Sequence, residues 1–526
     1  MKIATVNKDL YRYEIHALIK AFYPEEDVKV FVFADSPEGE LPGSADSLSA
    51  ELRNYIKEHG GDPKRDAALF LCVHYGENGL TVRAAGRCFA PLPEELPESF
   101  SGSFDRKSPA LGTALKHMLY RLLSELTGAV LPWGELIGIR PTKLAMEALS
   151  DGASREEAAF RMMREHRVSR EKAELAADIA VREREILSRI RCEDGYSLYI
   201  GIPFCPTTCL YCSFTSFPLA AWSGAVDDYL DALEREIRET SRIMRGRQLP
   251  DTVYIGGGTP TTLEPAQMDR LLRVIRECFP LEGLLEFTCE AGRPDSITRD
   301  KLRVLKNHGV SRISVNPQTM NDRTLRLIGR QHDAEQTVRA FYEAREAGFD
   351  NINMDIILGL PEETEGDVRH TVREIGRLAP DDLTVHSLAL KRSSRMQEWI
   401  ERNGFRAIRN TDETMRIAAE GAARMGLVPY YLYRQKNMSG NFENVGYAKP
   451  GNGREPARYG IYNILIMEER QTILALGAGA ITKRVFADGR IERCENAKDV
   501  TTYMENIGEM IKRKRRLFEE EWIRPE

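Results

Sequence analysis

The chain has 526 residues, of which 42% are hydrophobic and 29% are charged, a composition typical of globular proteins. Its 74 basic and 80 acidic residues leave a net charge of −6, and this near-balance argues against a general nucleic-acid binder. No stretch approaches the roughly 20 consecutive apolar residues of a membrane span, and the first residues lack the apolar core of a secretory signal. We therefore expect a cytoplasmic protein of about three domains.

The first third of the chain predicts two regions. Apolar runs surround one helical pattern up to about residue 110, and the apolar spacing is helical from there to about residue 190. In the second region, Ser154 and Glu157 have the spacing of a capping box, which marks the start of a helix. We predict a small α/β domain over 1–110 and a helical connector over 111–190. The expected elements are strands at 2–7, 28–33 and 67–75 and a helix at 10–22.

Six short apolar runs follow, separated by segments with helical periodicity. Alternation of strands and helices indicates βαβ units and a parallel sheet, and six units in about 200 residues fit a partial barrel better than a full one of eight strands. We predict an α/β fold with a partial (β/α)6 barrel over 191–390. Beyond residue 390 the alternation stops, and we expect an α+β region associated with the substrate over 391–526. The predicted strands are 197–203, 252–258, 285–291, 312–318, 351–359 and 383–390.

Three cysteines, Cys205, Cys209 and Cys212, follow the first predicted barrel strand with the spacing C-x3-C-x2-C. Three thiolates can hold three irons of a four-iron cluster and leave the fourth iron open to a substrate or a second cofactor. A structural zinc site needs a fourth ligand, and the nearest histidines in the sequence, His166 and His308, are distant. A disulfide with one spare thiol is rare in a cytosolic chain. We therefore predict that the three cysteines bind a [4Fe–4S] cluster.

The segment around these cysteines resembles the radical S-adenosylmethionine (SAM) superfamily, in which an aromatic residue usually precedes the third cysteine, as Tyr211 does here. The resemblance implies that SAM binds the open iron. One electron from the cluster would cleave SAM to methionine and a 5′-deoxyadenosyl radical, which takes a hydrogen atom from the substrate. The resemblance implies one SAM molecule as cofactor and leaves a second open. It also implies a reductant such as a flavodoxin or a ferredoxin as partner.

Glycines end the second predicted strand, where Gly256, Gly257 and Gly258 precede Thr259. Glycine lets the backbone approach a ligand closely, and the resemblance implies that this segment meets the methionyl amine of SAM. An ordinary strand-to-helix turn is the alternative. Tyr199, six residues before the first cysteine, is a candidate to line the cluster cavity, with packing on the barrel strand as its alternative.

Further residues match SAM-binding positions of the coproporphyrinogen-oxidising branch, in which they bind ribose and carboxylate groups. They lie at or beyond the ends of predicted strands, where parallel barrels place their sites. A surface charge or a structural salt bridge is the alternative for the charged ones. The segment from Ile357 to Gly359 resembles one that packs on adenine, with a plain strand end as the alternative. The cofactor-binding set is completed by Glu290, Gln318, Arg330 and Asp355, and the candidate catalytic residues are Tyr199, Glu290, Gln318 and Arg330.

Several phrases are similar to the oxygen-independent coproporphyrinogen III oxidase group. They lie at 199–206, 256–261, 313–332, 351–361 and 475–480. The stretch 435–451 and the segment from Gly134 to Leu144 resemble a bacterial subgroup, coproporphyrinogen dehydrogenase, which carries a long N-terminal extension. The implied substrate is a porphyrinogen, and the implied reaction is the oxidative decarboxylation of two propionates of coproporphyrinogen III to the vinyl groups of protoporphyrinogen IX.

Two other functions remain open. The best-known decarboxylases carry a further cysteine where this chain has Phe214, a residue shared with related haem chaperones. Those chaperones usually carry a C-terminal His-Asn motif, whereas the last histidine here is His386. A tRNA-modifying enzyme is the third hypothesis, because 512–516 is a basic run. The alternative for that run is a solvated helix face balanced by the acidic residues 519–521, and no nucleic-acid partner is expected.

Overall fold

The computed structural model divides the chain into two compact units, which are described separately. Unit 1 comprises residues 1–177, 434–436 and 440–442, and unit 2 comprises 178–433, 437–439 and 443–526. The four segments predicted from the sequence are thus distributed over two units. The structure describes residues 2–26, 28–32, 54, 57, 70–76, 79–84, 87–90, 106–137, 140–214, 216–246, 249–391, 394–404, 407–435 and 438–519.

Unit 1 is built on a five-stranded sheet with the order β2-β1-β3-β4-β5. The first three strands pair in parallel, and the last two continue the sheet antiparallel. Helices α1 and α3 pack against each other, with the rings of Phe22 and Tyr120 edge to face at 5.4 Å. The strands are β1 (Lys2–Val6), β2 (Val28–Val32), β3 (Phe70–Tyr75), β4 (Leu80–Ala84) and β5 (Arg87–Phe89), and the first helix is α1 (Arg12–Phe22).

The predicted helical stretch after residue 110 is present. Its helices are α3 (Pro109–Thr127), α4 (Pro141–Ser150), α5 (Arg155–His166) and α6 (Arg170–Leu187). The predicted capping box is confirmed: the Ser154 N–H donates to Glu157 Oε2 at 2.7 Å, and the Glu157 N–H donates to Ser154 Oγ at 3.2 Å. None of the helices within the described residues is long and apolar enough to cross a membrane.

Unit 2 is built on an open, curved sheet of eleven strands, which confirms the predicted partial barrel. Six parallel strands form its centre in the order β13-β12-β11-β10-β9-β6. They correspond to the six predicted strands. Their bounds are β6 (Gly195–Ile202), β9 (Leu249–Gly257), β10 (Glu286–Glu290), β11 (Arg312–Ser314), β12 (Ile352–Leu358) and β13 (Asp382–Ser387).

Strands from the C-terminal region, after the predicted strand–helix alternation has ended, extend this sheet at both edges. At one edge β15 pairs antiparallel with β13, and β14 pairs antiparallel with β15. At the other edge β16 pairs in parallel with β6 and is followed by the antiparallel β17 and β18. The strands are β14 (Val428–Tyr433), β15 (Asn444–Ala448), β16 (Thr472–Leu476), β17 (Ile481–Val485) and β18 (Ile491–Glu495).

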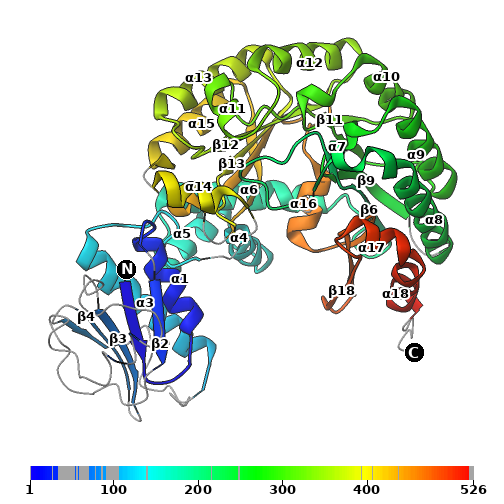
Figure 1. The fold of residues 1–526 in the computed structure, drawn as a ribbon. Coiled ribbons are helices and arrows are strands. Elements are labelled where there is room, and N and C mark those ends of the chain that lie inside the picture. The colour runs from blue at the N-terminus through cyan, green and yellow to red at the C-terminus, as the bar shows by residue number, and fades with distance from the viewer. Residues whose placement is uncertain are drawn as a thin grey trace. The chain divides into compact units, whose positions relative to one another are not determined.

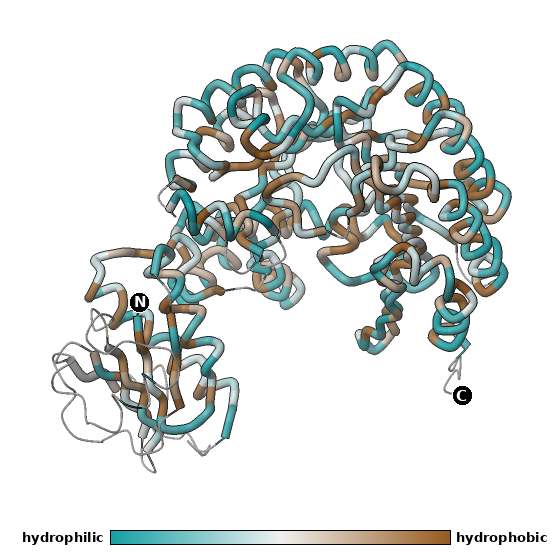
Figure 2. Tube along the Cα trace, in the orientation of Figure 1, coloured by the Kyte–Doolittle hydropathy of each residue, from teal (hydrophilic) through white to brown (hydrophobic). Residues whose placement is uncertain are grey.

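Helices surround the outer side of the sheet (Figure 1). Hydrophobic residues concentrate on the strands, and hydrophilic residues predominate on the outer turns of the helices (Figure 2). The helices of unit 2 after α6 are α7 (Leu219–Trp222), α8 (Val226–Met244), α9 (Pro265–Cys278), α10 (Arg299–Asn307), α11 (Asp322–Leu327), α12 (Ala334–Glu346), α13 (Glu365–Leu378), α14 (Met396–Asn403), α15 (Asp412–Arg424), α16 (Ile461–Glu468), α17 (Val500–Glu505) and α18 (Ile507–Glu519). Of these, α16 does not belong to the outer layer, because its residues line a cavity on the inner side of the sheet.

One buried ion pair fastens the C-terminal helices to the start of the barrel. Lys514 Nζ lies 2.6 Å from Glu236 Oε1, and both side chains are 0% exposed. Glu236 also accepts hydrogen bonds from the Tyr503 hydroxyl at 2.6 Å and from the Gly477 N–H at 2.8 Å. A solvated helix face, the alternative for the basic run 512–516, is wrong for Lys514, because the amphipathic α18 turns this residue toward α8.

Candidate functional site

The three cysteines lie at the C-terminal end of the parallel strands, where β6 continues into the short strand β7 (Phe204–Cys205). Each sulfur has a hydrogen-bonding neighbour. Thr259 Oγ1 donates to Cys205 Sγ at 3.4 Å, Arg293 Nη1 donates to Cys209 Sγ at 3.7 Å, and Ser216 Oγ lies 3.9 Å from Cys212 Sγ. Hydrogen bonds of this kind stabilise thiolates, which are the form of cysteine that binds iron.

Burial raises the pKa of the Cys205 and Cys212 thiols. The hydrogen bond from Thr259 to Cys205 and that from the Phe214 N–H to Cys212 act in the opposite direction. Within the described ranges, no three His, Cys, Asp or Glu side chains converge as ligands of a single metal ion. Thiolates of a four-iron cluster each bind a different iron, so the donor set and its hydrogen bonds fit a cluster better than a mononuclear site.

Backbone contacts hold the cysteine loop on the segment that follows α11. The Leu210 N–H donates to the Ile328 carbonyl at 2.9 Å, and Thr207 Oγ1 donates to the Gly329 carbonyl at 3.0 Å. From the other side, Arg395 Nη2 donates to the Thr208 carbonyl at 2.6 Å. Because these hydrogen bonds do not involve the sulfurs, they fix the path of the loop and leave the three cysteine sulfurs available as metal ligands.

The glycine run joins the end of β9 to the strand that carries the cysteines. The Gly258 N–H donates to the Ile202 carbonyl at 2.7 Å, and a Cβ atom on Gly258 would lie 2.6 Å from the Phe204 carbonyl oxygen. Gly257 has a φ of 108°, which favours glycine. A Cβ on Gly256 would lie 3.1 Å from the Glu290 carboxylate. Because these residues have no side chains, the end of β9 can approach the segment that leads into the cysteine loop. Binding of SAM by this glycine segment stays a prediction.

Glu290 and Asp355 lie in the wall of one polar cavity of about 160 Å³ inside the curved sheet. Burial raises the pKa of Glu290 to about 7, although the Tyr254 hydroxyl donates to its carboxylate. Burial also acts to raise the pKa of Asp355, but the neighbouring His386 outweighs it and lowers that pKa. The Asp355 Oδ2 to His386 Nε2 distance is 3.6 Å. The site thus holds one carboxyl that titrates near neutrality beside one that stays ionised.

Aromatic rings pack beside this cavity. Tyr199 and Tyr254 are register partners on β6 and β9, and their rings stack at 6.2 Å. Tyr462 of α16 stacks on Tyr254 at 4.4 Å. Tyr199 is not among the residues that line the cavity, and its contacts are those of a side chain that packs on the barrel strands. A role of Tyr199 toward the cluster stays a prediction.

Gln318 and Arg330 lie next to the same strands but outside the lining of this cavity. Gln318 has a φ of 68°, which is rare for a residue with a side chain, and its buried Oε1 has no hydrogen-bond partner among the described residues. Arg330 donates from Nη2 to the Tyr211 hydroxyl at 2.9 Å and from Nη1 to the Gly292 carbonyl at 3.2 Å. Its buried Nε also lacks a partner in the described part of the chain. Contact of these two orphaned polar atoms with a bound cofactor stays a prediction.

Ile357 and Gly359 lie at the end of β12. Ile357 is buried in an apolar cluster against which Leu210 and Tyr211 of the cysteine loop pack. Gly359 has a φ of 82°, and a Cβ atom there would lie 3.1 Å from Ser439 Oγ. Contact of this segment with adenine stays a prediction.

Sequence reasoning missed two residues of the site, Tyr254 and Arg293. Tyr254 lies two residues before the glycine run, so strand alternation places it on the same face as Gly256, and this pattern could have identified it. Arg293 follows Glu290 by three residues in a turn of small residues. Nothing in the sequence indicates that its guanidinium is buried against Cys209, with only 3% of the residue exposed.

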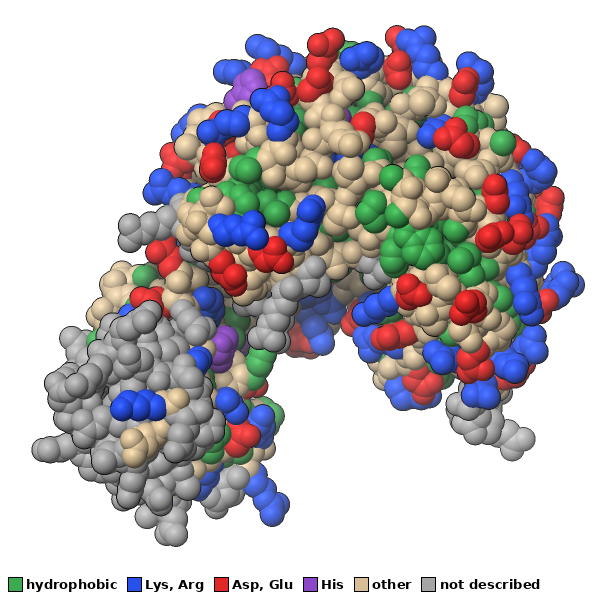
Figure 3. Space-filling view, viewed as in Figure 1, with side chains coloured by type: hydrophobic (Ala, Val, Ile, Leu, Met, Phe, Trp, Pro, Cys, Tyr) green, Lys and Arg blue, Asp and Glu red, His purple; other side chains and the backbone are tan. Residues whose placement is uncertain are grey.

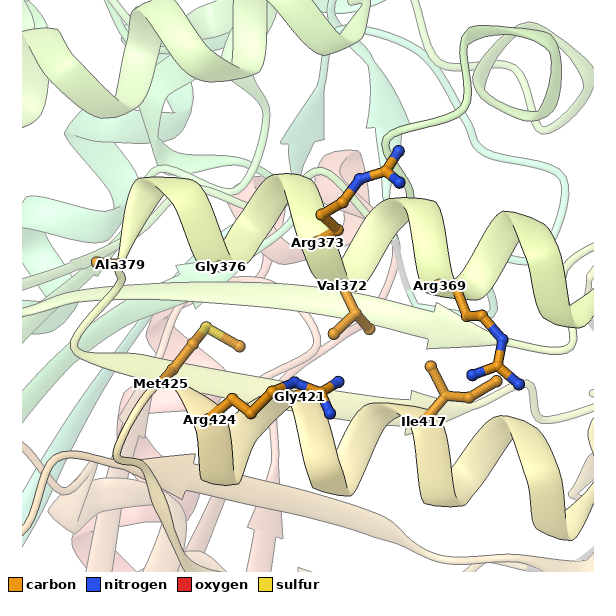
Figure 4. A pocket seen from close by; sticks show the side chains of 9 residues that line it. All are labelled: Arg369, Val372, Arg373, Gly376, Ala379, Ile417, Gly421, Arg424 and Met425. Atoms are coloured by element: carbon orange, nitrogen blue, oxygen red, sulfur yellow. The ribbon is translucent and has the colours of Figure 1, made fainter.

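A larger groove of about 660 Å³ lies between α13 and α15, as Figure 4 shows. It belongs to the outer helical layer and has no lining residue from a strand. Each of its arginines has a carboxylate partner, the pairs being Arg369 with Glu413, Arg373 with Glu374, and Arg424 with Glu420. This groove is therefore not the candidate site.

On the face shown in Figure 3, basic and acidic side chains are interspersed over the outer helices.

The chain is similar to known proteins over most of its length. The family model of the radical SAM superfamily matches residues 199–375. The Bacillus subtilis (strain 168) protein named oxygen-independent coproporphyrinogen-III oxidase-like protein HemZ is 36% identical over 471 residues, which cover 88% of this chain and 93% of that protein.

Two other relatives match a shorter region. The heme chaperone HemW of Bacillus subtilis (strain 168) is 40% identical over 198 residues, 37% of this chain and 51% of that protein. The oxygen-independent coproporphyrinogen III oxidase of Escherichia coli (strain K12) is 36% identical over 197 residues, 38% of this chain and 42% of that protein. The match thus spans about half or less of these two relatives.

Proposed function

Because the chain belongs to the radical SAM superfamily, in the group of the oxygen-independent coproporphyrinogen III oxidases, we propose that it decarboxylates coproporphyrinogen III oxidatively to protoporphyrinogen IX. Membership of the superfamily implies a [4Fe–4S] cluster and SAM. The observation that carries the proposal is the set of three hydrogen-bonded thiols at the strand ends, next to a polar cavity. A relative named oxygen-independent coproporphyrinogen-III oxidase-like protein, similar along 93% of its own length, supports the choice of substrate.

Cys205, Cys209 and Cys212 would hold the cluster, with one iron left open for SAM. When bound, the cluster and SAM supply the one-electron cleavage and the hydrogen abstraction that start decarboxylation. The loop residues keep the three sulfurs in place through bonds to the segment after α11. A one-electron reductant, such as a flavodoxin or a ferredoxin, is the partner that this chemistry requires.

Glu290 and Asp355, which both line the cavity, would bind hydroxyl groups of the SAM ribose. With a pKa of about 7, Glu290 exists in both protonation states near neutrality and can either donate or accept a hydrogen bond. Asp355 accepts from Asn353 Nδ2 at 2.7 Å and keeps its charge through His386, so it acts as an acceptor only. The two carboxyls therefore fix the orientation of a diol placed between them.

Arg330 and Gln318 would meet the amino-acid end of SAM. The free Nε of Arg330 is a cationic donor suited to a carboxylate. The unpartnered Oε1 of Gln318 is an acceptor suited to an ammonium or hydroxyl group. The stacked rings of Tyr199, Tyr254 and Tyr462 pack beside the cavity, where apolar packing would help to keep water away from a radical reaction.

The experiment is an anaerobic turnover assay on protein reconstituted with iron and sulfide, reduced, and supplied with SAM and coproporphyrinogen III. Mass spectrometry follows 5′-deoxyadenosine and the porphyrinogen. We expect deoxyadenosine formation that depends on the porphyrinogen, with loss of two CO2 per molecule. Cys209→Ala should abolish both activity and cluster binding. Cys278→Ala, outside the motif, is the matched control and should retain both.

A full complement of about four irons in Cys209→Ala would contradict the ligand assignment. Deoxyadenosine without decarboxylation would contradict the choice of substrate.

A haem carrier is the second candidate, and Phe214 favours it. This residue is 77% exposed, two positions beyond Cys212, where the best-known decarboxylases have a further cysteine. Stoichiometric haem binding together with an absence of decarboxylation would select the carrier. Turnover of coproporphyrinogen III by the same preparation would exclude it as the main function.

A further inference from the structure

Arg293 lies buried directly beneath the cysteine loop, in the turn between β10 and the short 3-10 helix Pro294–Ser296. Its Nη1 donates to Cys209 Sγ at 3.7 Å and to Thr207 Oγ1 at 3.1 Å. Its Nε and Nη2 donate to the two carboxylate oxygens of Asp295 at 2.9 and 2.8 Å. The guanidinium is therefore fixed at both ends, with one amino group aimed at a sulfur.

The residues around Asp295 hold its carboxylate in the ionised form. Burial acts to raise the pKa of Asp295, but the neighbouring His332 and the hydrogen bonds from Arg293 outweigh it and lower that pKa. His332 Nδ1 lies 3.6 Å from Asp295 Oδ1, and the His332 side chain is 0% exposed. Both Arg293 and Asp295 are thus locked in one geometry, and the positive end of the pair faces the sulfur.

We propose that Arg293 is a positioning residue that sets the reduction potential of the iron–sulfur cluster through its hydrogen bond to Cys209. The inference rests on the proposed function, in which Cys209 is a cluster ligand. Reduction adds one negative charge to the cluster. A buried cation beside a ligand sulfur stabilises the reduced form more than the oxidised form and so raises the potential. Asp295 partly cancels that charge, which keeps the effect moderate.

The geometry distinguishes Arg293 from Arg330, a second buried arginine close to the cysteine loop. Arg330 directs its amino groups to backbone carbonyls and to the Tyr211 hydroxyl, and donates to none of the three sulfurs. Arg293 donates to a sulfur directly. Tuning of the cluster is therefore assigned to Arg293, while Arg330 remains available to SAM.

The test is a redox titration of the reconstituted full chain without SAM or substrate, with reduction by dithionite followed by electron paramagnetic resonance. Iron content is measured on every sample. At the potential where half of the wild-type clusters are reduced, Arg293→Met should lower the ratio of reduced to oxidised cluster about tenfold, which corresponds to about 59 mV for one electron. Arg293→Lys keeps the charge and should restore most of that ratio. Asp295→Asn removes the compensating charge and should raise the ratio.

Opposite shifts in Arg293→Met and Asp295→Asn at full iron content would support the proposal, because a purely structural role cannot reverse sign. An unchanged ratio in Arg293→Met at full iron content would overturn it. Equal loss of iron from Arg293→Met and Arg293→Lys would also overturn it and would make Arg293 a clamp for the loop around Thr207. If the wild-type chain itself takes up no cluster, the proposed function fails first, and this inference fails with it.

Discussion

Replacing Lys514 with Met should destabilise unit 2 by about 3 kcal/mol, because it leaves the buried Glu236 carboxylate without its cation. Loss of one partner from a buried ion pair typically costs about 3–5 kcal/mol. The lower end applies here, since Glu236 keeps hydrogen bonds from the Tyr503 hydroxyl, the Gly477 N–H and Asn496 Nδ2. Those three donors satisfy both oxygens but do not supply a full positive charge.

A double-mutant cycle can separate the energy of the ion pair between Glu236 and Lys514 from the energy with which the two side chains pack. Glu236→Gln and Lys514→Met should each be costly, and the double variant should lose less than the sum by at least about 1 kcal/mol. Arg513→Met is the matched control on the same helix, because its pair with Glu509 at 3.4 Å is exposed. Exposed pairs contribute less than about 1 kcal/mol.

The assay is urea unfolding followed by circular dichroism, with the free energy of unfolding compared among the four variants at pH 7. The reasoning would be refuted if Lys514→Met lost no more stability than Arg513→Met. It would also be refuted if the losses in the two single variants simply added in the double variant, because then the two side chains would not act as a pair.

Two further predictions concern the candidate site. The folded-state pKa of Glu290 is raised to about 7, so its contribution to stability is present in full below about pH 4.5 and is lost as the pH rises through 7. Glu290→Gln should remove this pH dependence, which amounts to at most about 3 kcal/mol. The measurement is the difference in the free energy of unfolding between pH 5 and pH 8, obtained from urea unfolding. If this difference is the same in the variant and the wild type, the pH dependence does not come from Glu290. Gly258→Ala should cost about 1–3 kcal/mol and lower the iron content after reconstitution, because the new Cβ would lie 2.6 Å from a backbone oxygen that cannot move aside. Gly224→Ala, where a Cβ meets nothing within 4 Å, is its control, and equal iron contents would refute the steric argument.

The central strands could be predicted because each βαβ unit is local: a run of apolar residues is followed by its own helix. The edge strands could not, because β16 pairs with β6 across more than 270 positions of the sequence (Thr472 opposite Tyr196). The argument applies more weakly to β15, which pairs with β13 across 60 positions where Val385 lies opposite Val445, and β14 then pairs with β15. Local periodicity carries no information on such partners.

The residues of the candidate site and of the buried ion pair also differ in how far the sequence could predict them. The cysteine spacing is local, so the sequence could indicate a cluster directly. Arg293 and Lys514 are charged residues that are mostly exposed in proteins, and their burial depends on partners that local patterns do not identify. The partner of Lys514, Glu236, is 278 positions away. Buried charges of this kind are visible only after the chain has folded.

The pairing of β16 with β6 also bears on the order of events during synthesis. The strand that leads into the cysteine loop lacks its partner on one side until residues 472–476 have emerged, about 270 residues after β6 itself. At about 5–20 residues per second, this delay is on the order of half a minute. During that time β6 presents an open edge, which favours pairing with the wrong strand or with another chain. A nascent chain can pair β6 with β9 early, but β6 gains its second partner only after residues 472–476 have emerged.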